Sequence, residues 1–180
     1  MAPLLAGAIV LTGCVSMEPG AGPGNSTSSS PASTTTAWKD FEAGNLDASR
    51  AMFERFTLEH PSDPSGHFGL GRVTLAQGQR EDSIGHFQRA IALDNASAAH
   101  WAYLGTAQLQ LERNADALVS LQKALTLDPK QGQALVAMAE YALTVDVDYT
   151  KALHHLELAK TSGFAAIPPE LEPAIRQKLN

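Results

Sequence analysis

The stretch SIGHFQRAIALDN (83–95) is repeated, with substitutions, as ALVSLQKALTLDP (117–129). The copies begin at Ser83 and Ala117, and they share a Gln, a basic residue, an Ala and a Leu-Asp pair at the same places. In each copy the apolar residues recur at spacings of three and four, which places them on one face of an α-helix. The sequence therefore predicts a helical unit that repeats with a period of about 34 residues.

The residues that precede each copy repeat with the same period. The aligned residues are Leu70 and Leu104, Gly71 and Gly105, and Leu75 and Leu109. A helical period of about 34 residues resembles the tetratricopeptide repeat (TPR), a helix-turn-helix unit that stacks on its neighbours into a superhelix. The first helix of the family's unit carries an aromatic residue before a Leu-Gly pair. Trp101 fills that place in one unit, and His67 fills it in the other.

The second helix of the family's unit carries small, large and small residues, which let neighbouring helices approach closely. The two central units supply Ser83, Phe87 and Ala90, and Ala117, Leu121 and Ala124. An earlier second helix matches EAGNLDASRAMFERFTLEHP (42–61), in which Phe56 replaces the last small residue. A later second helix matches at Ala152, Leu156 and Ala159, each one place later than the period predicts, because one residue is inserted before it.

These matches predict an all-α fold, a right-handed superhelix of about three to four helix-turn-helix units. We expect the units at about residues 37–63, 64–97, 98–131 and 132–162, which together form a TPR domain over 37–162. Residues 163–180 read as a loop and a short helix. This C-terminal helix would cover the apolar face of the last unit, because the ends of a solenoid need such a cap.

The resemblance implies a concave surface lined mostly by the first helices, at residues that do not pack between helices. Carried over to this sequence, the protein-binding groove comprises Trp38, Phe41, Phe68, Arg72, Leu75, Thr106, Leu109, Glu140 and Leu143, together with Ala102 and Val136. The best-known use of the groove in the family is a clamp of Asn, Lys and Arg residues on a partner's C-terminal carboxylate. Arg72 is the only basic residue in the set, so a chaperone-tail adaptor is disfavoured.

One aligned column of this set is apolar throughout. Its members are Phe41, Leu75, Leu109 and Leu143. Such a column suits an amphipathic helix or an extended apolar segment of a partner protein. The alternative is that these residues are core, because leucine at helical spacing usually packs inside a protein. The sequence leaves the two interpretations open.

No motif in the sequence predicts catalysis or a bound cofactor. It contains no HExxH motif, no Gly-rich phosphate loop with a Lys and no GxSxG motif. The adjacent His154 and His155 would point about 100° apart on a helix, so we do not expect them to chelate a metal together. The net charge of −6 argues against nucleic-acid binding, which needs clustered positive charge. We expect no enzyme activity, no cofactor and no metal site.

The N-terminal segment predicts export and lipidation. Residues 4–11 are almost wholly apolar, which suits a signal-peptide core and is too short for a membrane span. They end in Leu11-Thr12-Gly13-Cys14, which resembles the bacterial lipobox, a Leu and two small residues before a Cys. The resemblance implies a signal peptide over 1–13, cleavage before Cys14 and acylation of that cysteine. The opening MAP departs from the pattern, since it carries no Lys or Arg.

Residues 14–36 consist mainly of Gly, Pro, Ser and Thr, a composition that predicts a disordered tether. With lipid on Cys14, the tether would hold the repeats near a bilayer. Val15 follows the cysteine where an Asp would favour the inner membrane in enteric-type sorting. We therefore expect a lipid anchor in the bacterial outer membrane, with the repeats facing the periplasm.

The combined pattern predicts a non-catalytic scaffold that holds another cell-envelope protein, as an assembly factor for a pilus, secretion or other envelope machine. It resembles the pilotins and the small repeat lipoproteins of tight-adherence pili, a likeness of architecture alone. Two other interpretations stay open. One is a structural or peptidoglycan-associated lipoprotein. The other is a soluble cytosolic TPR adaptor, if the N-terminal match is fortuitous.

Overall fold

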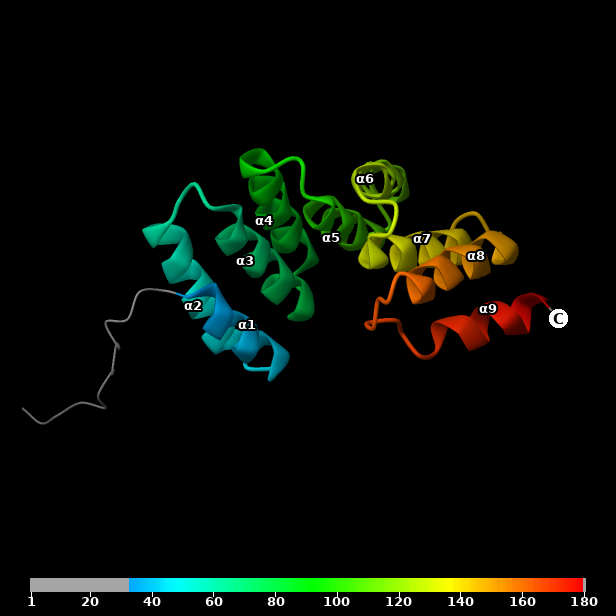
Figure 1. Cartoon of the computed structure of the whole chain (residues 1–180), viewed down its shortest axis with the longest axis horizontal. Coiled ribbons are helices and arrows are strands. Elements are labelled where there is room, and N and C mark those ends of the chain that lie inside the picture. The colour runs from blue at the N-terminus through cyan, green and yellow to red at the C-terminus, as the bar shows by residue number, and fades with distance from the viewer. Residues whose placement is uncertain (1–32, 180) are drawn as a thin grey trace, which may run out of the picture. The chain divides into compact units, whose positions relative to one another are not determined.

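The computed structural model describes residues 33–179, and this part of the chain contains nine helices and no strand (Figure 1). The helices are α1 (Thr34–Glu42), α2 (Leu46–Glu59), α3 (Pro64–Ala76), α4 (Arg80–Leu93), α5 (Ala98–Leu109), α6 (Asn114–Leu127), α7 (Gly132–Thr144), α8 (Tyr149–Thr161) and α9 (Leu171–Leu179). Within the described residues, no helix has both the length and the apolar character that crossing a membrane requires.

The predicted signal peptide, the lipidation site Cys14 and most of the predicted tether lie outside the described residues. The last part of the tether is an exception, because Thr34–Thr36 form the first turn of α1. Ala37 donates its backbone N–H to the carbonyl oxygen of Ser33 at 3.3 Å, and its side chain is buried. The helix therefore begins before residue 37. The earlier start gives the backbone N–H of the buried Ala37 a hydrogen-bond acceptor, the carbonyl oxygen of Ser33.

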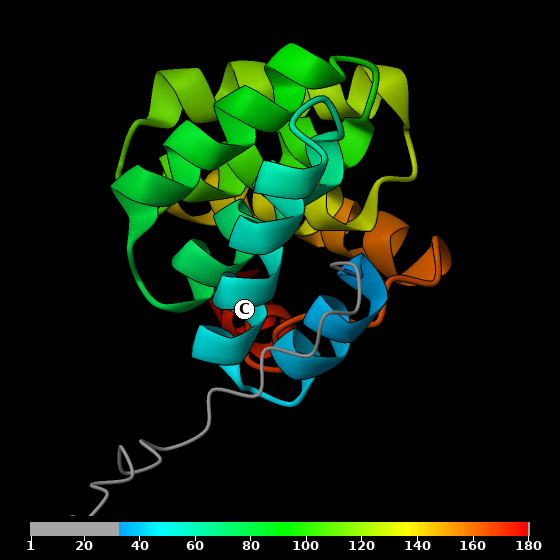
Figure 2. The same ribbon diagram turned by 90° about the vertical axis from the view of Figure 1, so that its left-hand side faces the viewer.

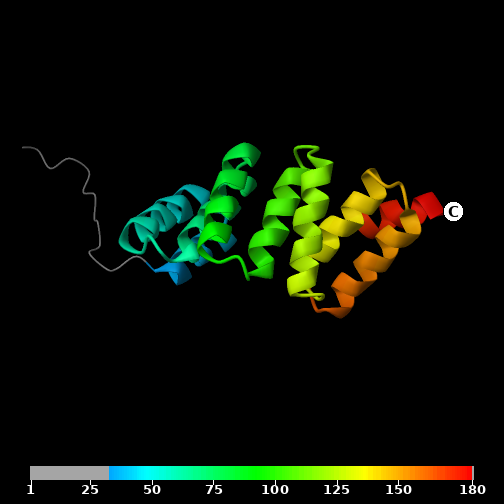
Figure 3. The ribbon, with the colours of Figure 1, turned by 90° about the horizontal axis from the view of Figure 1, so that it is seen from above.

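The first eight helices form four consecutive pairs, which follow one another from α1–α2 to α7–α8 (Figure 1). Seen from above, helices that are neighbours in the chain also lie side by side (Figure 3). Figure 2 looks along the stack of helix pairs from the α1–α2 end and shows the later pairs behind the first. Each unit packs mainly against the next one, as expected for a solenoid.

Local sequence signals set where helices begin. The carboxylate of Asp63 accepts a hydrogen bond from the Ser65 backbone N–H at 2.8 Å, and Pro64 occupies the first position of α3. At α8, the carboxylate of Asp148 accepts from the Lys151 N–H at 2.9 Å. Both acids satisfy backbone donors that a helix leaves unpaired at its first turn.

The small and large residues of the repeat form the contacts between the helices of each pair. The large residues are fully buried at equivalent places in α2, α4, α6 and α8: Phe53, Phe87, Leu121 and Leu156. The first helix presents small residues at the matching places, all of them buried: Ala37, Gly71, Gly105 and Ala139. A Cβ atom added at Gly105 would lie 2.7 Å from Cγ of Leu121. The absence of a side chain there is what lets α5 and α6 pack so closely.

The turn inside each pair contains one residue with a left-handed backbone. Gly44 (φ 80°) and Gly78 (φ 77°) occupy this place in the first two pairs. Glu112 (φ 58°) and Val147 (φ 54°) occupy it in the last two. Glycine adopts positive φ without steric penalty, whereas a residue with a Cβ atom is strained there. The last two turns therefore hold strain that the first two lack.

The predicted C-terminal capping helix is α9, which packs against α8 at the end of the stack (Figure 1). Leu171 and Ile175 are buried in one cluster with Leu135 and Leu156. Phe164 and Ile167, from the loop before α9, also pack against this cluster. The segment after α8 thus supplies the apolar cover that the next unit would otherwise provide.

Candidate protein-binding face

The first helix of each pair places two columns of equivalent side chains on one surface. The first column is Trp38, Arg72, Thr106 and Glu140, and the second is Phe41, Leu75, Leu109 and Leu143. The members of each column follow one another at the repeat period, so they come from α1, α3, α5 and α7 in turn. We call the surface formed by these eight residues the first-helix face.

Arg72 lies among three aromatic rings at the α1–α5 end of this face. Its guanidinium carbon is 4.8 Å from the ring centroid of Trp38, 4.7 Å from that of Phe41 and 4.9 Å from that of Tyr103. Each distance is within the range of a cation–π interaction. The rings come from both first helices that flank α3, so Arg72 links three successive units. This arrangement holds its charge in a fixed place.

The aromatic residues of the face also reach into the core. Trp38 packs edge-on against the buried ring of Phe53, with 4.8 Å between centroids. Phe68 lies 5.4 Å from Tyr103 and 6.0 Å from the buried ring of Phe87. Such aromatic pairs add packing energy beyond the burial of apolar area. Trp38 and Phe68, which we expected in the groove, are therefore half-buried residues that anchor it.

The apolar column divides between the two interpretations that the sequence leaves open. All four residues are half-buried. Phe41, Leu75 and Leu143 each pack against a cluster of buried residues. Leu109 packs against none of the four clusters in residues 33–179, and it lines a pocket instead. Leu109 is thus the column member that a partner can reach without displacing a core contact.

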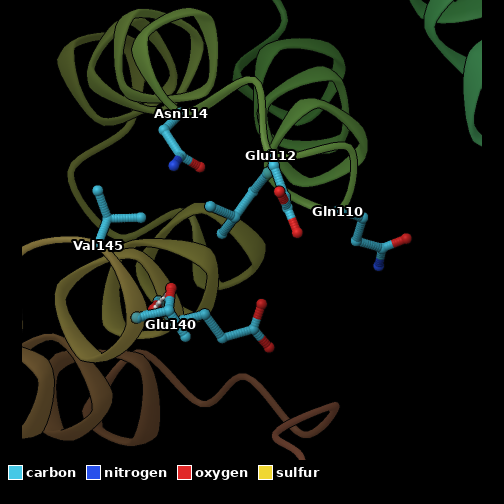
Figure 4. Close-up of a pocket in the computed structure, with 7 residues that line it drawn as sticks. Gln110, Glu112, Asn114, Glu140 and Val145 are labelled. Atoms are coloured by element: carbon cyan, nitrogen blue, oxygen red, sulfur yellow. Dashed lines mark hydrogen bonds between the residues drawn. The ribbon is translucent and has the colours of Figure 1, made fainter.

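The pocket, which we call the α5–α7 pocket, lies where α5 and α7 end and α6 begins (Figure 4). It has a volume of about 460 Å³ and is lined by Leu109, Gln110, Glu112, Asn114, Glu140, Thr144 and Val145. In Figure 4 the carboxylates of Glu112 and Glu140 and the amide of Gln110 lie on the same side of the pocket. The pocket therefore combines apolar walls with a rim of hydrogen-bond acceptors.

Glu140 is half-buried at this rim, and its electrostatic surroundings are unfavourable for a negative charge. Burial is the main cause that raises the pKa of its carboxyl group, and the nearby carboxylate of Glu170 raises this pKa further. No residue that lines the pocket is basic. The side chain of Glu140 also has no hydrogen bond or ion pair with another described residue.

Thr106 and the small members of the predicted groove are closed to a partner. Thr106 is buried, and its hydroxyl donates to the Ala102 carbonyl oxygen at 2.9 Å. The same hydroxyl accepts from Nε2 of Gln133 at 3.0 Å. Ala102 and Val136 are buried as well, at 0% and 3% exposure. Thr106 is therefore a member of the first-helix face that a partner cannot reach, and Ala102 and Val136 belong to the buried clusters.

Sequence reasoning missed six residues that line the pocket or the arginine site: Tyr103, Gln110, Glu112, Asn114, Thr144 and Val145. Glu112 carried a detectable signal, because it aligns with Gly44 and Gly78 at the turn of the repeat. Tyr103 carried no such signal, because its equivalent in the preceding unit is Gly69. A glycine at that place gave no indication that its counterpart would contact Arg72.

Nothing in the described part of the chain forms a metal centre. No group of three or more His, Cys, Asp or Glu residues in it could hold a metal ion. The rings of His154 and His155 are 6.0 Å apart and inclined by 52°. The chemistry that the first-helix face and its pocket offer is recognition by apolar contact and charge.

Comparison with known sequences identifies the class of protein to which this architecture belongs. A family model described as a tetratricopeptide repeat matches residues 35–98 and, overlapping them, residues 71–132. These matches cover more than half of the chain. The chain belongs to the tetratricopeptide-repeat family, which agrees with the all-α solenoid predicted from the repeat period.

Curated relatives match a limited part of this chain. The CTR9 homolog of Arabidopsis thaliana is 33% identical over 108 residues, which cover 58% of this chain and 10% of that protein. The PEX5-related protein of Homo sapiens is 34% identical over 100 residues, which cover 55% of this chain and 15% of that protein. The chain thus spans a small fraction of the length of these relatives.

Solved structures share the fold at low sequence identity. A TPR protein of Thermus thermophilus has a TM-score of 0.70 and 20% identity, over 81% of this chain and 78% of that one. The pilF protein of Pseudomonas aeruginosa has a TM-score of 0.68 and 16% identity, over 81% and 65%. The first TPR of Spaghetti (RPAP3), bound to an HSP90 peptide, has a TM-score of 0.59 and 15% identity, over 63% and 90%. The predicted TPR fold is confirmed.

Proposed function

We propose that this chain is a non-catalytic TPR lipoprotein that binds a partner protein on its first-helix face. The observation that carries the binding function is the α5–α7 pocket, which opens beside Leu109 in the column repeated across the units. A pocket with apolar walls and a few polar groups suits a side chain of a partner polypeptide. The related fold in Spaghetti (RPAP3) was solved with an HSP90 peptide bound, which supports peptide binding by this architecture.

A lipid attached to Cys14 holds the protein on a membrane. The support is the lipobox-like sequence Leu11-Thr12-Gly13-Cys14 and the Gly-, Pro-, Ser- and Thr-rich segment that follows it. Several acyl chains on one residue anchor a protein firmly, whereas one chain alone binds marginally. With Val15 after the cysteine, the site of action is the outer membrane, and the repeats face the periplasm.

The partner is then another cell-envelope protein, and the role is assembly of a pilus, secretion or related machine. The likeness of fold to the pilF protein of Pseudomonas aeruginosa is compatible with this role, although it concerns the fold alone. Pilotins and tight-adherence pilus lipoproteins are the families whose architecture this chain resembles.

Metabolic labelling tests the membrane anchor. Bacterial cells that express the full chain are grown with radioactive palmitate, and the protein is isolated and counted. We expect label on the wild type and none on Cys14→Ala, because the thiol is the first site of acylation. Absence of label on the wild type would sink the lipoprotein proposal and favour a soluble cytosolic adaptor.

Site-specific photo-crosslinking tests the binding face. A photoreactive amino acid is placed at position 109, in the first-helix face, and separately at position 119. Val119 is the matched control, because it is 65% exposed on the second helix α6. We expect a discrete crosslinked polypeptide from position 109 alone. Crosslinks to cell-wall material without a protein product would favour the structural lipoprotein instead.

A further inference from the structure

We propose that the segment bound to the first-helix face carries a lysine or arginine side chain, and that this side chain enters the α5–α7 pocket between Glu112 and Glu140. The inference rests on the proposed binding function of the face, and it adds the chemistry of the partner. The occupant is therefore a polypeptide whose basic residue is flanked by apolar residues, which pack on Leu109 and its neighbours in the apolar column.

The charge around the pocket carries the inference. Glu112 and Glu140 line it, and Glu170 lies close enough to Glu140 to raise the pKa of its carboxyl group. None of these three acids forms an ion pair with a described residue. A cation supplied from outside would complement the charges of Glu112 and Glu140, and the nearby Glu170 would add to its attraction.

The basic residues of the last unit, and Arg176 of α9, do not neutralise this region, because they are already paired. Lys151 donates to the carboxylate of Asp146 at 2.7 Å. Lys160 and Arg176 both pair with Glu172. Arg72, on the other side of α5, lies among aromatic rings. Arg80 donates to Oε1 of Gln110 at 3.1 Å at the edge of the pocket, and Arg113, next to Glu112 in the chain, pairs with Glu81. The lining itself carries two acids and no basic residue.

The shape of the pocket fits a long cationic side chain. Leu109 and Val145 supply apolar walls, against which the methylene stem of a lysine or arginine can pack. The side-chain oxygen of Asn114 can accept a hydrogen bond that the carboxylates do not take, whereas Oε1 of Gln110 already accepts one from Nε of Arg80 at 3.1 Å. A cavity of about 150 Å³ is enough for benzene. The volume of about 460 Å³ therefore admits such a side chain.

A half-buried carboxylate gains most from a charged partner. Glu140 has lost part of its water, and no group in the described residues compensates for that loss. A lysine or arginine at the pocket would restore a charge-assisted hydrogen bond in a partly dry site. An acidic or neutral side chain in the same place would meet repulsion or leave the carboxylate unpaired, so the pocket selects against both.

Glu112 offers a test that separates binding from folding. Its backbone is in the left-handed region, at the place where the first two pairs have Gly44 and Gly78. Replacing it with glycine removes one carboxylate from the pocket and also relieves the strained φ. We expect Glu112→Gly to lose affinity for a basic peptide while its melting temperature rises. A variant that merely folded less well would instead show a lower affinity and a lower melting temperature.

The experiment uses a random-peptide phage library selected on the full chain. Parallel selections use Glu140→Gln, which keeps the shape of the side chain, and Glu157→Gln, a matched control for an exposed acid on α8. We expect the wild type and the control to enrich peptides that contain lysine or arginine, and Glu140→Gln to lose this preference. Fluorescence anisotropy then measures each enriched peptide and its variant with the basic residue replaced by methionine. The replacement should weaken binding to the wild type about tenfold and binding to Glu140→Gln at most about twofold.

The outcomes distinguish this inference from the function on which it rests. Enriched peptides that bind through Leu109 but show no basic preference would overturn the charged pocket and leave the binding face intact. Enrichment of acidic peptides, with Arg72 as the residue on which they depend, would overturn it as well. If Leu109→Ala reduces no peptide binding at all, both the inference and the proposed binding face fail.

Discussion

The ring of Phe87 in α4 occupies the space that a side chain at Gly71 in α3 would need. A Cβ atom added at Gly71 would lie 2.5 Å from Cε1 and 2.6 Å from Cδ1 of that ring. Both residues are buried, and Phe87 has no exposed surface. The pair therefore fixes how closely the two helices of the second unit approach each other.

We predict that Gly71→Ala lowers the free energy of unfolding by about 2 kcal/mol, because the added methyl group overpacks a filled core. Gly85→Ala is the matched control. Gly85 lies on an exposed part of α4 with no atom near its Cβ position, so alanine should raise the free energy of unfolding by about 0.5–1 kcal/mol. Urea denaturation of both variants measures the difference. A neutral Gly71→Ala would show that the Phe87 ring can move aside.

The repeat itself could be predicted from the sequence, because each unit buries the same positions against its neighbour. Ala117, Leu121 and Ala124, which the alignment predicts as packing residues, all have 0% exposure. Ser83, at the start of the equivalent set, is also fully buried. A period that reflects packing is visible in the sequence because packing restricts residue size at each place.

The site was harder to predict because it depends on contacts between units that differ. Arg72 contacts the ring of Tyr103 in α5. The equivalent residue of α3 is Gly69, so the repeat pattern does not predict a ring at this place. The α5–α7 pocket joins Gln110 to Val145, residues from two turns of the solenoid. A period describes what units share, whereas these features arise where one unit departs from the others.

Val147→Gly should stabilise the protein. The φ angle of Val147 is 54°, and its side chain is 57% exposed, so it holds backbone strain without burying much apolar area. We expect the free energy of unfolding to rise by about 1 kcal/mol, which is the left-handed penalty less the chain entropy of glycine. Gly78→Ala, at the equivalent place with a φ angle of 77°, should lower it by a similar amount. Opposite shifts in melting temperature would confirm that the turn demands positive φ, and equal shifts would contradict it.

Leu75 and Leu109 should respond differently to truncation although they align in the repeat. Leu75 packs against the cluster that contains Ile84 and Phe87, whereas Leu109 lines the α5–α7 pocket. Leu75→Ala should therefore lower the free energy of unfolding by about 2 kcal/mol, and Leu109→Ala should change it by less than about 1 kcal/mol. We also expect Leu109→Ala to weaken the binding of a peptide selected on the wild type more than Leu75→Ala does, although Leu109→Ala destabilises the fold less. Equal destabilisation by the two variants would place Leu109 in the core.

Acidification should destabilise the fold through its partly buried histidines. The rings of His67 and His86 stack with 6.1 Å between centroids. Burial is the main cause that lowers the pKa of each below 6.5. The charge of Arg89 lowers the pKa of His67 further. At His86 the charges of His67, Arg50 and Arg89 lower the pKa further, and Asp82 partly opposes the shift. Burial also lowers the pKa of His155. The unfolded chain thus binds protons near pH 6.5 more readily than the folded chain does.

The stability that these histidines contribute is present above pH 6.5 and is lost as the pH falls through their lowered folded-state pKa values. Glu140 acts in the opposite direction, because its raised pKa favours proton uptake by the folded protein. As the pH is lowered from 7.5 to 5.5, the melting temperature of the wild type should therefore fall, and that of His86→Gln should fall less. Glu140 is present in both proteins, so its opposing effect does not alter the comparison. His60→Gln, at an exposed residue, is the control for the loss of a histidine side chain as such. If His86→Gln loses as much stability on acidification as the wild type does, the stacked histidines are not the source of the pH dependence.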